Sequence, residues 1–418
     1  MSDDHSPRPQ TAHPLDPADV QAISDWLVEQ GLYTAGFETL FAGFCERLVA
    51  AGVPLWRGQV AMRTLHPTVD AIAYRWRPAS GVESASLLYS DSESEAWLQS
   101  PFHHMLASGT RTLRHRLDGE PTALPFPILD EFRGGGATDY CARVIGYGFE
   151  PQKDARSGVI SSWTTDQPGG FGEHHIATLD RLLPRLALSL KSTLTYQISV
   201  NLLDTYVGPD AGRRILDGEI RRGAAEVIRA VLWFADLRGF TAFSDTTPKE
   251  EVFGTLDEYF DCMVRPLVGH GGQGLKFLGA GLIGTFDLQH MAKDAVCRAS
   301  LDSAVEALKL VDELNAARRA AGNPVLRLDL ALHLGDVLYG NVGALDRQDF
   351  TLIGPAVNEA SRIEALCETL DRNLLISETF ATAASQCTGR LVSVGRHHLR
   401  GVRDAQELFT VDQPGTAG

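Results

Sequence analysis

The spacing of hydrophobic and polar positions changes along the chain, and the first 171 residues contain both helix-like and strand-like spacing. Apolar residues at three- and four-residue steps predict helices, whereas short extended runs predict strands. This order of helices, strands and loops is typical of an α+β domain. The predicted segments are helices at 19–51 and 97–108, strands at 58–65, 70–76, 142–149 and 157–163, a polar interval at 80–95 and a loop at Gly134–Gly136.

A second region, from about Gly172 to Asp217, has one long helical pattern. A stripe of this length with few neighbouring core residues predicts a helix that pairs with a second copy of itself. The alternative is a helix that caps the N-terminal domain. Pro184 predicts a kink or an end within the pattern, and Gly208-Pro-Asp-Ala211 predicts a break. The stripe consists of Ile176, Leu179, Leu182, Leu183, Leu186, Leu188, Leu190, Leu194, Ile198, Leu202 and Leu203.

The C-terminal half has the most regular order of elements. Its β-α-β-β-α-β order, followed by a further strand and helix, predicts a ferredoxin-like domain. With a boundary near residue 205, we expect a disordered tail at 1–18, an α+β domain at 19–171, a helical linker and dimerisation segment at 172–223 and the ferredoxin-like domain at 224–414. The predicted elements are strands 231–237, 274–279, 281–287, 325–334 and 350–353, and helices 248–268, 291–320 and 355–370.

Composition narrows the possible functions. The 418 residues carry a formal net charge of −15 without a Lys/Arg cluster, which argues against binding to nucleic acid. No apolar run reaches the ~18 residues of a membrane span, and the polar N-terminus lacks the apolar core of a signal peptide. The six cysteines form no C-x-x-C pair, which indicates reduced thiols. We therefore expect a cytoplasmic protein without a membrane span.

One strand of the C-terminal half ends in a lone carboxylate. Apolar residues from Val231 lead to Asp236, and a polar turn that contains Gly239 follows. A buried strand with this ending delivers a carboxylate to the edge of a pocket, where it can bind a metal ion. The backbone N–H groups of the following turn can bind phosphates.

Four motifs at coherent spacing resemble those of the class III nucleotide cyclases. The resemblance covers about residues 228–412, roughly the C-terminal half, and implies a nucleotide cyclase catalytic domain. The motifs are Phe234-Ala-Asp-Leu-Arg-Gly-Phe-Thr241, Leu275-Lys-Phe-Leu-Gly-Ala-Gly-Leu282, Leu332-His-Leu-Gly-Asp-Val-Leu-Tyr-Gly-Asn-Val-Gly343 and Phe350-Thr-Leu-Ile-Gly-Pro-Ala-Val-Asn-Glu-Ala-Ser-Arg-Ile-Glu364.

The resemblance implies a site for two Mg²⁺ or Mn²⁺ ions that bind the nucleotide triphosphate and activate the ribose 3′-hydroxyl. Asp236 and the backbone of Leu237 match the first metal position. The second Asp of the family falls at Ala280, which cannot bind a hard cation. Asp287 lies seven strand residues further on, and Asp261 precedes the hairpin on a predicted helix, so neither replaces it.

The same resemblance assigns the purine-reading positions to Lys276 and Thr351. A Lys donor suits the N1 acceptor of adenine, and the Thr hydroxyl can accept from the adenine 6-amino group. Guanine would instead require an acidic group at the position of Lys276. This pair therefore favours ATP over GTP.

The remaining positions of the family contact the ribose and the phosphates. Asn358 and Arg362 lie one helical turn apart, so both project from one face of a predicted helix. The resemblance implies that Asn358 holds the ribose and Arg362 neutralises charge on the reacting phosphate. It also implies phosphate contacts from Arg400 and from the backbone of Gly239, Phe240 and Thr241.

In this family the metal-binding and purine-reading residues come from one subunit, and the Asn and Arg come from its partner. Because one chain carries both sets, the resemblance implies a homodimer with two interfacial sites, formed through the cyclase domains and the helical linker. The expected function is an adenylate cyclase that forms 3′,5′-cyclic AMP and pyrophosphate, impaired by Ala280. The alternatives are an inactive ATP-binding regulatory pseudocyclase or a dimeric scaffold. No Gly-Gly-Asp/Glu-Glu-Phe signature of a diguanylate cyclase occurs.

The pattern of the N-terminal domain loosely resembles that of a GAF-type ligand-binding domain. This resemblance implies a small-molecule ligand and a sensor that controls the C-terminal half. No ligand motif identifies that molecule, and the alternative is a structural or dimerising domain without a ligand.

Overall fold

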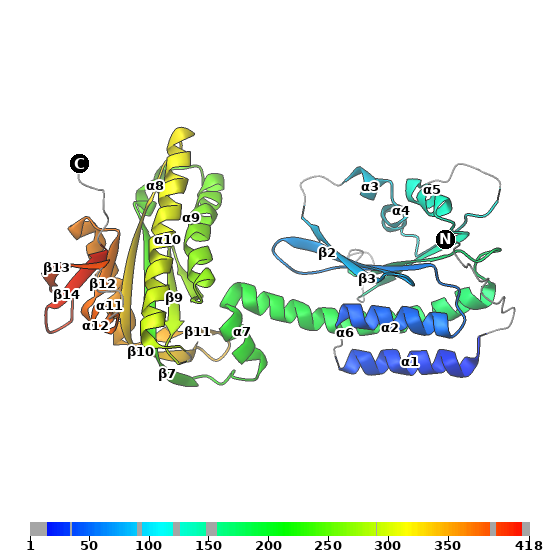
Figure 1. The fold of residues 1–418 in the computed structure, drawn as a ribbon, viewed down its shortest axis with the longest axis horizontal. Coiled ribbons are helices and arrows are strands. Elements are labelled where there is room, and N and C mark those ends of the chain that lie inside the picture. The colour runs from blue at the N-terminus through cyan, green and yellow to red at the C-terminus, as the bar shows by residue number, and fades with distance from the viewer. Residues whose placement is uncertain are drawn as a thin grey trace, which may run out of the picture. The chain divides into compact units, whose positions relative to one another are not determined.

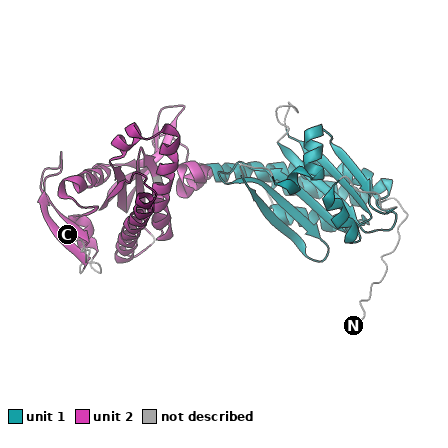
Figure 2. Cartoon of the chain, turned by 90° about the horizontal axis from the view of Figure 1, so that it is seen from above, with its two compact units in different colours: residues 1–202 teal, residues 203–418 magenta. Residues whose placement is uncertain are grey.

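The computed structural model describes residues 15–33, 36–89, 94–119, 126–147, 157–289, 291–384 and 390–411. The chain divides into two compact units, residues 1–202 and 203–418 (Figure 2). Residues 1–14 of the predicted tail lie outside the described residues. The tail prediction is wrong for its last two positions, because Pro17 and Ala18 begin the first helix after the N-cap Asp16.

The N-terminal unit is built on a six-stranded antiparallel sheet with the strand order β3-β2-β1-β6-β5-β4. The mixture of helices and sheet confirms the predicted α+β class. The predicted polar interval is wrong in part, because residues 81–88 form strand β3. Its elements are α1 (Pro17–Leu32), α2 (Phe37–Ala50), β1 (Arg57–Arg63), β2 (Val69–Arg77), β3 (Gly81–Leu88), α3 (Glu95–Leu98), α4 (Pro101–Ser108), β4 (Thr112–Arg116), α5 (Pro127–Gly134), β5 (Asp139–Gly146) and β6 (Gly158–Thr165).

The two faces of this sheet have different partners. One face packs against α1, α2 and α6, the long helix that follows β6 (Glu173–Val207), in a core that contains Leu27, Phe44 and Trp163. The other face carries a smaller cluster with α4 and α5, to which Phe132 and Tyr140 belong. Arg57, Gln59, Arg75 and Arg77 also lie on this second face, because alternate residues of each strand point to opposite sides.

Helix α6 (Glu173–Val207) is continuous through Pro184 and is followed by α7 (Pro209–Leu216). Most of its apolar stripe is buried within its own unit. Leu179, Leu182, Leu183, Leu186, Leu190 and Leu194 pack in the core with α1 and α2, whereas Leu188 is exposed. The expectation that this part of the stripe pairs with a second copy is therefore wrong, and the alternative of a capping helix describes it. Beyond residue 194, Leu202 and Tyr206 are exposed.

The C-terminal unit has the predicted ferredoxin-like β-α-β-β-α-β order. Its strands lie in the order β13-β14-β12-β10-β7-β9-β8, and β11 pairs with β10 (Figure 1). The six framework elements are β7 (Ala225–Arg238), α9 (Lys249–Gly269), β8 (Gln273–Leu278), β9 (Gly281–Asp287), α10 (Lys293–Ala320) and β10 (Arg327–Gly343). The additions are α8 (Phe240–Thr246), β11 (Gln348–Ile353), α11 (Pro355–Leu370), β12 (Leu374–Ser377), α12 (Glu378–Ala383), β13 (Leu391–His397) and β14 (Gln406–Val411).

Strand β7 shows how the sequence positions the site. Val231, Trp233 and Ala235 are buried in the core beneath α9 and α10. Ala230 and Leu232 belong to the opposite face, which α11 covers. Successive side chains continue to alternate between these two faces up to the end of the strand, so the position of each later residue determines its face. Within the described residues, no helix is long and apolar enough to cross a membrane.

Candidate nucleotide site

Asp236 lies near the C-terminal end of β7. Its neighbours Ala235 and Leu237 are buried beneath α9 and α10, so the Asp236 side chain lies on the face of α11. Burial raises the pKa of this carboxyl group, and a hydrogen bond from the Leu237 backbone partly offsets the rise. No basic side chain contributes to the shift among the described residues. The carboxylate is therefore available to an external cation.

The β8–β9 hairpin lies beside this carboxylate. The paired residues Leu278 and Gly281 enclose the turn Gly279-Ala280, and Gly279 has a φ of +66°. A Cβ atom on Gly281 would lie 2.9 Å from Oδ1 of Asp236 and 2.5 Å from the Ala235 carbonyl oxygen, so only glycine fits there. Ala280 itself is buried and belongs to the core. The hairpin turn next to Asp236 thus offers a methyl group where the sequence comparison expects a carboxylate.

Neither of the other two acidic residues is placed to replace that carboxylate. Asp287 lies opposite Ala230, at the far end of β9, and Asp261 is exposed on α9. Among the described residues, no group of three or more His, Cys, Asp and Glu side chains can hold a metal ion. The Asp236 carboxylate and the Leu237 carbonyl fit one Mg²⁺ or Mn²⁺ ion that takes its other ligands from phosphates and water. They do not fit a two-ion site.

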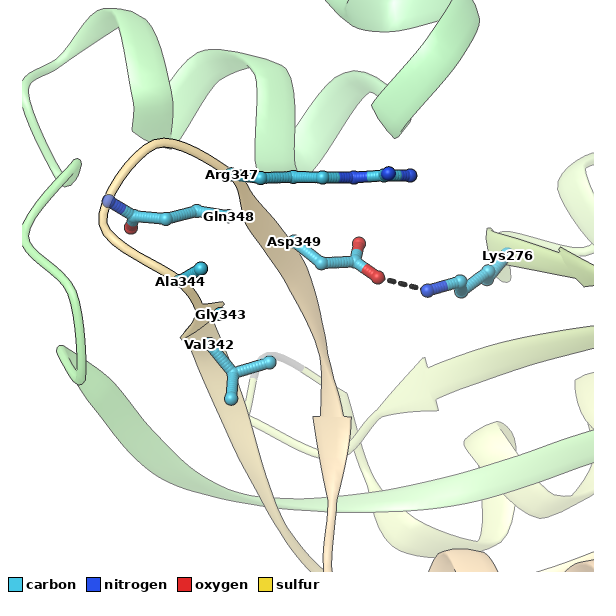
Figure 3. A pocket seen from close by; sticks show the side chains of 7 residues that line it. All are labelled: Lys276, Val342, Gly343, Ala344, Arg347, Gln348 and Asp349. Carbon is cyan, nitrogen blue, oxygen red and sulfur yellow. Dashed lines mark hydrogen bonds and ion pairs between the residues drawn. The ribbon is translucent and has the colours of Figure 1, made fainter.

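Lys276 of β8 forms an ion pair with Asp349 of β11 (Figure 3). Both side chains are partly exposed and line an open cavity of about 570 Å³ next to the β10–β11 turn. In β11, Phe350 and Leu352 are buried, so Thr351 shares the opposite face with Asp349. The two purine-reading positions of the sequence comparison, Lys276 and Thr351, are therefore brought to the same region of one protomer.

Helix α11 presents the second set of residues. Asn358 is exposed and Arg362 is partly exposed on this helix. A Cβ atom on Gly401 would lie 3.5 Å from Nη2 of Arg362, so the turn that contains Arg400 lies beside that guanidinium group. Arg400 is exposed. The helix starts close to β10, where a Cβ atom on Gly335 would lie only 2.5 Å from that of Ala356.

The turn after Asp236 leads directly into a short helix. Gly239 has a φ of +87° and is the N-cap of α8, which begins at Phe240 and contains Thr241. Gly239 and Thr241 are exposed, and Phe240 is partly buried. The turn therefore follows the candidate metal ligand without an intervening segment.

The structure places several of the candidate residues beside identified neighbours. Asp236 lies with the hairpin turn, Lys276 lies with the strand of Thr351, and Arg362 lies with the turn of Arg400. Within the described parts of the protomer, no hydrogen bond or ion pair connects Asp236 or Lys276 with Arg362.

Sequence reasoning missed a charged cluster behind Asp236. Asp236 is directly opposite Asp329 in the β7–β10 pair. Asp329 is buried and accepts two hydrogen bonds of 2.6 Å from Arg238. Burial raises the pKa of Glu364 on α11 to about 7, and the negative charges of Asp236 and Asp329 add to this rise. The alternation of β7 could have indicated that Arg238 shares a face with Asp236, but nothing local indicated Glu364.

Comparison with known proteins identifies this fold and these motifs. The family of the Adenylate and Guanylate cyclase catalytic domain matches residues 225–413. Residues 225–413 are therefore similar to a nucleotide cyclase catalytic domain, and they lie within the C-terminal unit. The predicted resemblance is thereby confirmed.

The curated relatives include an adenylate cyclase from Anabaena cylindrica, 34% identical over 164 residues, which are 38% of this chain and 32% of that protein. Adenylate cyclase 1 from Rhizobium meliloti is 30% identical over 43% of this chain and 26% of its own. The chain thus spans about a third or less of the length of these relatives. The crystal structure of the adenylyl cyclase CyaB from P. aeruginosa aligns with 46% of this chain and 98% of its own, at 24% identity and a TM-score of 0.41.

Proposed function

We propose that this protein is an adenylate cyclase that converts ATP to 3′,5′-cyclic AMP and pyrophosphate, and that Ala280 keeps its turnover low. The observation that carries the proposal is the position of Lys276 beside the strand of Thr351, within a region that is similar to the cyclase catalytic domain. A donor and a hydroxyl group at this place suit the edge of adenine. Two curated relatives named adenylate cyclase support the same choice of nucleotide.

The proposed roles follow from the chemistry of each side chain. Lys276 donates to the adenine N1 atom, and the Thr351 hydroxyl accepts from the 6-amino group. Asn358 orients the ribose, while Arg362 binds the reacting phosphate and neutralises its charge. Arg400 and the backbone N–H groups of the turn after Asp236 bind the remaining phosphates.

Divalent ions of the family would supply charge for the triphosphate and would lower the pKa of the attacking hydroxyl group when bound. Here Asp236 and Leu237 provide ligands for one Mg²⁺ or Mn²⁺ ion. Position 280 provides none, so the approach of the ribose 3′-oxygen to the phosphate is less well stabilised. Loss of one carboxylate of such a site lowers the rate by orders of magnitude while nucleotide affinity persists.

We further propose that two copies of the chain build each site, in a head-to-tail homodimer. The presence of both residue sets on one chain, Asp236 and Lys276 in one and Asn358 and Arg362 in the other, supports this arrangement, because the class III cyclases divide these sets between two subunits. The exposed end of α6 extends the proposed contact between copies. The N-terminal unit would regulate the cyclase domain, and the five described cysteines, all free, suit a cytoplasmic location.

Two other functions remain as alternatives, each with a specific observation in its favour. Ala280 favours an inactive pseudocyclase that binds ATP for regulation. The large N-terminal unit favours a dimeric scaffold. Cyclic AMP and cyclic GMP formation by the full chain with Mn²⁺, together with calorimetric titration of ATP and GTP, distinguishes the three. Slow formation of cyclic AMP supports the proposal, ATP binding without turnover supports the pseudocyclase, and absence of binding supports the scaffold.

A further inference from the structure

A cavity of about 800 Å³ lies in the N-terminal unit, on the sheet face that is opposite α1 and α2. Strands β1 and β2, helix α5 and the start of α4 contribute to its wall. Its size is within the range of small-molecule sites. None of the cyclase motifs belongs to this unit, so the cavity is distinct from the nucleotide site proposed above.

The most unusual group in the cavity is Arg57 of β1. This residue is only 6% exposed, and its Nη1 atom is buried without a hydrogen-bond partner among the described residues. Its Nη2 atom donates to Gln59, and its guanidinium group lies 4.8 Å from the centre of the Phe132 ring. A buried charged donor that lacks a partner destabilises the empty state, so this nitrogen favours an external acceptor.

Two further arginines give the cavity an anion-binding character. Arg75 and Arg77 of β2 line the same space, and Arg77 stacks on Trp56 at 4.8 Å. Burial lowers the pKa of Arg57 to about 10, and repulsion from Arg75 and Arg77 adds to the effect. These three cations therefore lie close enough to repel one another, and an anion between them would relieve the repulsion.

Much of the remaining wall is aromatic, apolar or neutral. Phe102, Ile128, Phe132 and Tyr140 line the cavity near Arg57. Planar rings among these side chains suit a flat, apolar part of a ligand.

Two carboxylates also line the cavity, namely Glu83 and Glu131. Both residues are exposed, and Glu83 lies opposite Arg75 in the β2–β3 pair. They therefore neutralise part of the exposed positive charge and leave the buried Nη1 atom of Arg57 as the unsatisfied donor. A ligand that satisfies this donor must bring its own acceptor into the cavity.

We infer that this cavity binds a small organic anion, with a carboxylate or phosphate group on Arg57 and the exposed arginines, and a planar apolar body against Phe132 and Tyr140. The ligand contributes the acceptor that Arg57 lacks. Its binding site lies entirely within the N-terminal unit and does not depend on nucleotide turnover.

The test is calorimetric titration of the full chain with three matched probes, benzoate, phenyl phosphate and uncharged benzamide. We expect one or both anions to bind and benzamide to bind at least about 10-fold more weakly, because a charge-assisted hydrogen bond is lost. The stronger of the two anions identifies the headgroup as carboxylate or phosphate. Failure of both anions to bind up to about 10 mM, or equal binding of benzamide, overturns the inference.

Variants assign the binding to this cavity. Arg57→Gln should weaken the affinity for the anion by at least about 10-fold. Arg63→Gln, at an exposed position of the same strand, should leave this affinity unchanged. If Arg57→Gln fails to fold by circular dichroism, the double variant Arg75→Gln/Arg77→Gln, at exposed positions, replaces it with the same expected loss. Anion binding that is unaffected by both sets of substitutions contradicts the inference, whatever the cyclase activity of the chain.

Discussion

The Oδ1 atom of Asp236 lies 2.9 Å from the position that a Cβ atom on Gly281 would occupy. The backbone of the hairpin therefore passes close to the carboxylate that we propose as a metal ligand. Ala280 precedes Gly281, so a second carboxylate at position 280 would belong to the turn beside Asp236. The low activity that we propose for the chain therefore has a local and reversible cause.

Ala280→Asp should raise kcat/KM for cyclic AMP formation by at least about 100-fold, because a second carboxylate completes the ligand set for two ions. Ala280→Asn, which has nearly the same volume without the charge, should stay near the activity of the unchanged chain. The measurement is initial rate against ATP concentration in the presence of Mn²⁺. An Asp variant that is no faster than the Asn variant while both bind ATP would indicate a regulatory pseudocyclase.

Because position 280 is buried, the same substitution has a second measurable effect. An Asp side chain at position 280 destabilises the folded state when no cation is bound, and a bound cation offsets this loss. The melting temperature of Ala280→Asp should therefore rise with Mn²⁺ and ATP by more than that of Ala280→Asn, as measured by differential scanning fluorimetry. Equal shifts in the two variants would show that the new carboxylate does not reach a metal ion.

The ion pair between Lys276 and Asp349 leads to a prediction about nucleotide choice. Lys276→Met should reduce the preference for ATP over GTP by about 10-fold or more, since the donor for adenine N1 is removed. Asp349→Asn is the matched control, because it breaks the same exposed ion pair, worth about 0.2–1 kcal/mol, and keeps the lysine. Titration calorimetry with both nucleotides gives the ratio. If the ratio of ATP affinity to GTP affinity changes as much in Asp349→Asn as in Lys276→Met, the effect belongs to the ion pair.

Glu364 should make the stability of the C-terminal unit depend on pH. Its pKa in the folded state is about 7, above the ordinary value of 4.5, so the folded state binds more protons than the unfolded state between these values. Stability therefore falls as the pH rises through this window and is constant above it. Glu364→Gln should remove this dependence and raise the melting temperature by a few degrees at about pH 8, with little change at about pH 4.

Glu368→Gln, an exposed position on the same helix, is the control for that experiment. Melting curves of the three proteins across the pH range provide the comparison. If the melting temperature of Glu364→Gln changes with pH as much as that of the unchanged chain, another group is responsible.

Arg238 and Asp329 form a largely buried ion pair near the site. Arg238→Met leaves a carboxylate whose side chain is 5% exposed without its partner, and should lower the free energy of unfolding by about 3–5 kcal/mol. The double variant Arg238→Met/Asp329→Leu should recover most of this loss, because it removes the unpaired charge. Urea denaturation measures both. A double variant as unstable as the single one would show that packing around Arg238, rather than its charge, is required.

Periodicity and local motifs predicted much of the cyclase domain and part of the N-terminal unit. The alternation of β7 and the lone Asp236 were sufficient to place one candidate ligand at a strand end. The interactions that were missed depend on residues distant in sequence. Glu364 approaches Asp236 only because α11 packs on the face of the sheet that carries the Asp236 side chain. Most of the apolar stripe of α6 is buried only because α1 and α2 cover it. The extension of β10 to Gly343 likewise depends on its pairing with β7 and β11.

The central claim is that each nucleotide site needs residues from two copies of the chain. Equilibrium dialysis with labelled ATP and Mn²⁺ tests it directly on two variants, Lys276→Ala and Arg362→Ala, alone and mixed in equal amounts. Each variant alone should bind ATP weakly, and the mixture should recover tight binding at a minority of sites, because mixed dimers contain one intact site. A mixture that binds no more ATP than the average of the separate variants would contradict the account.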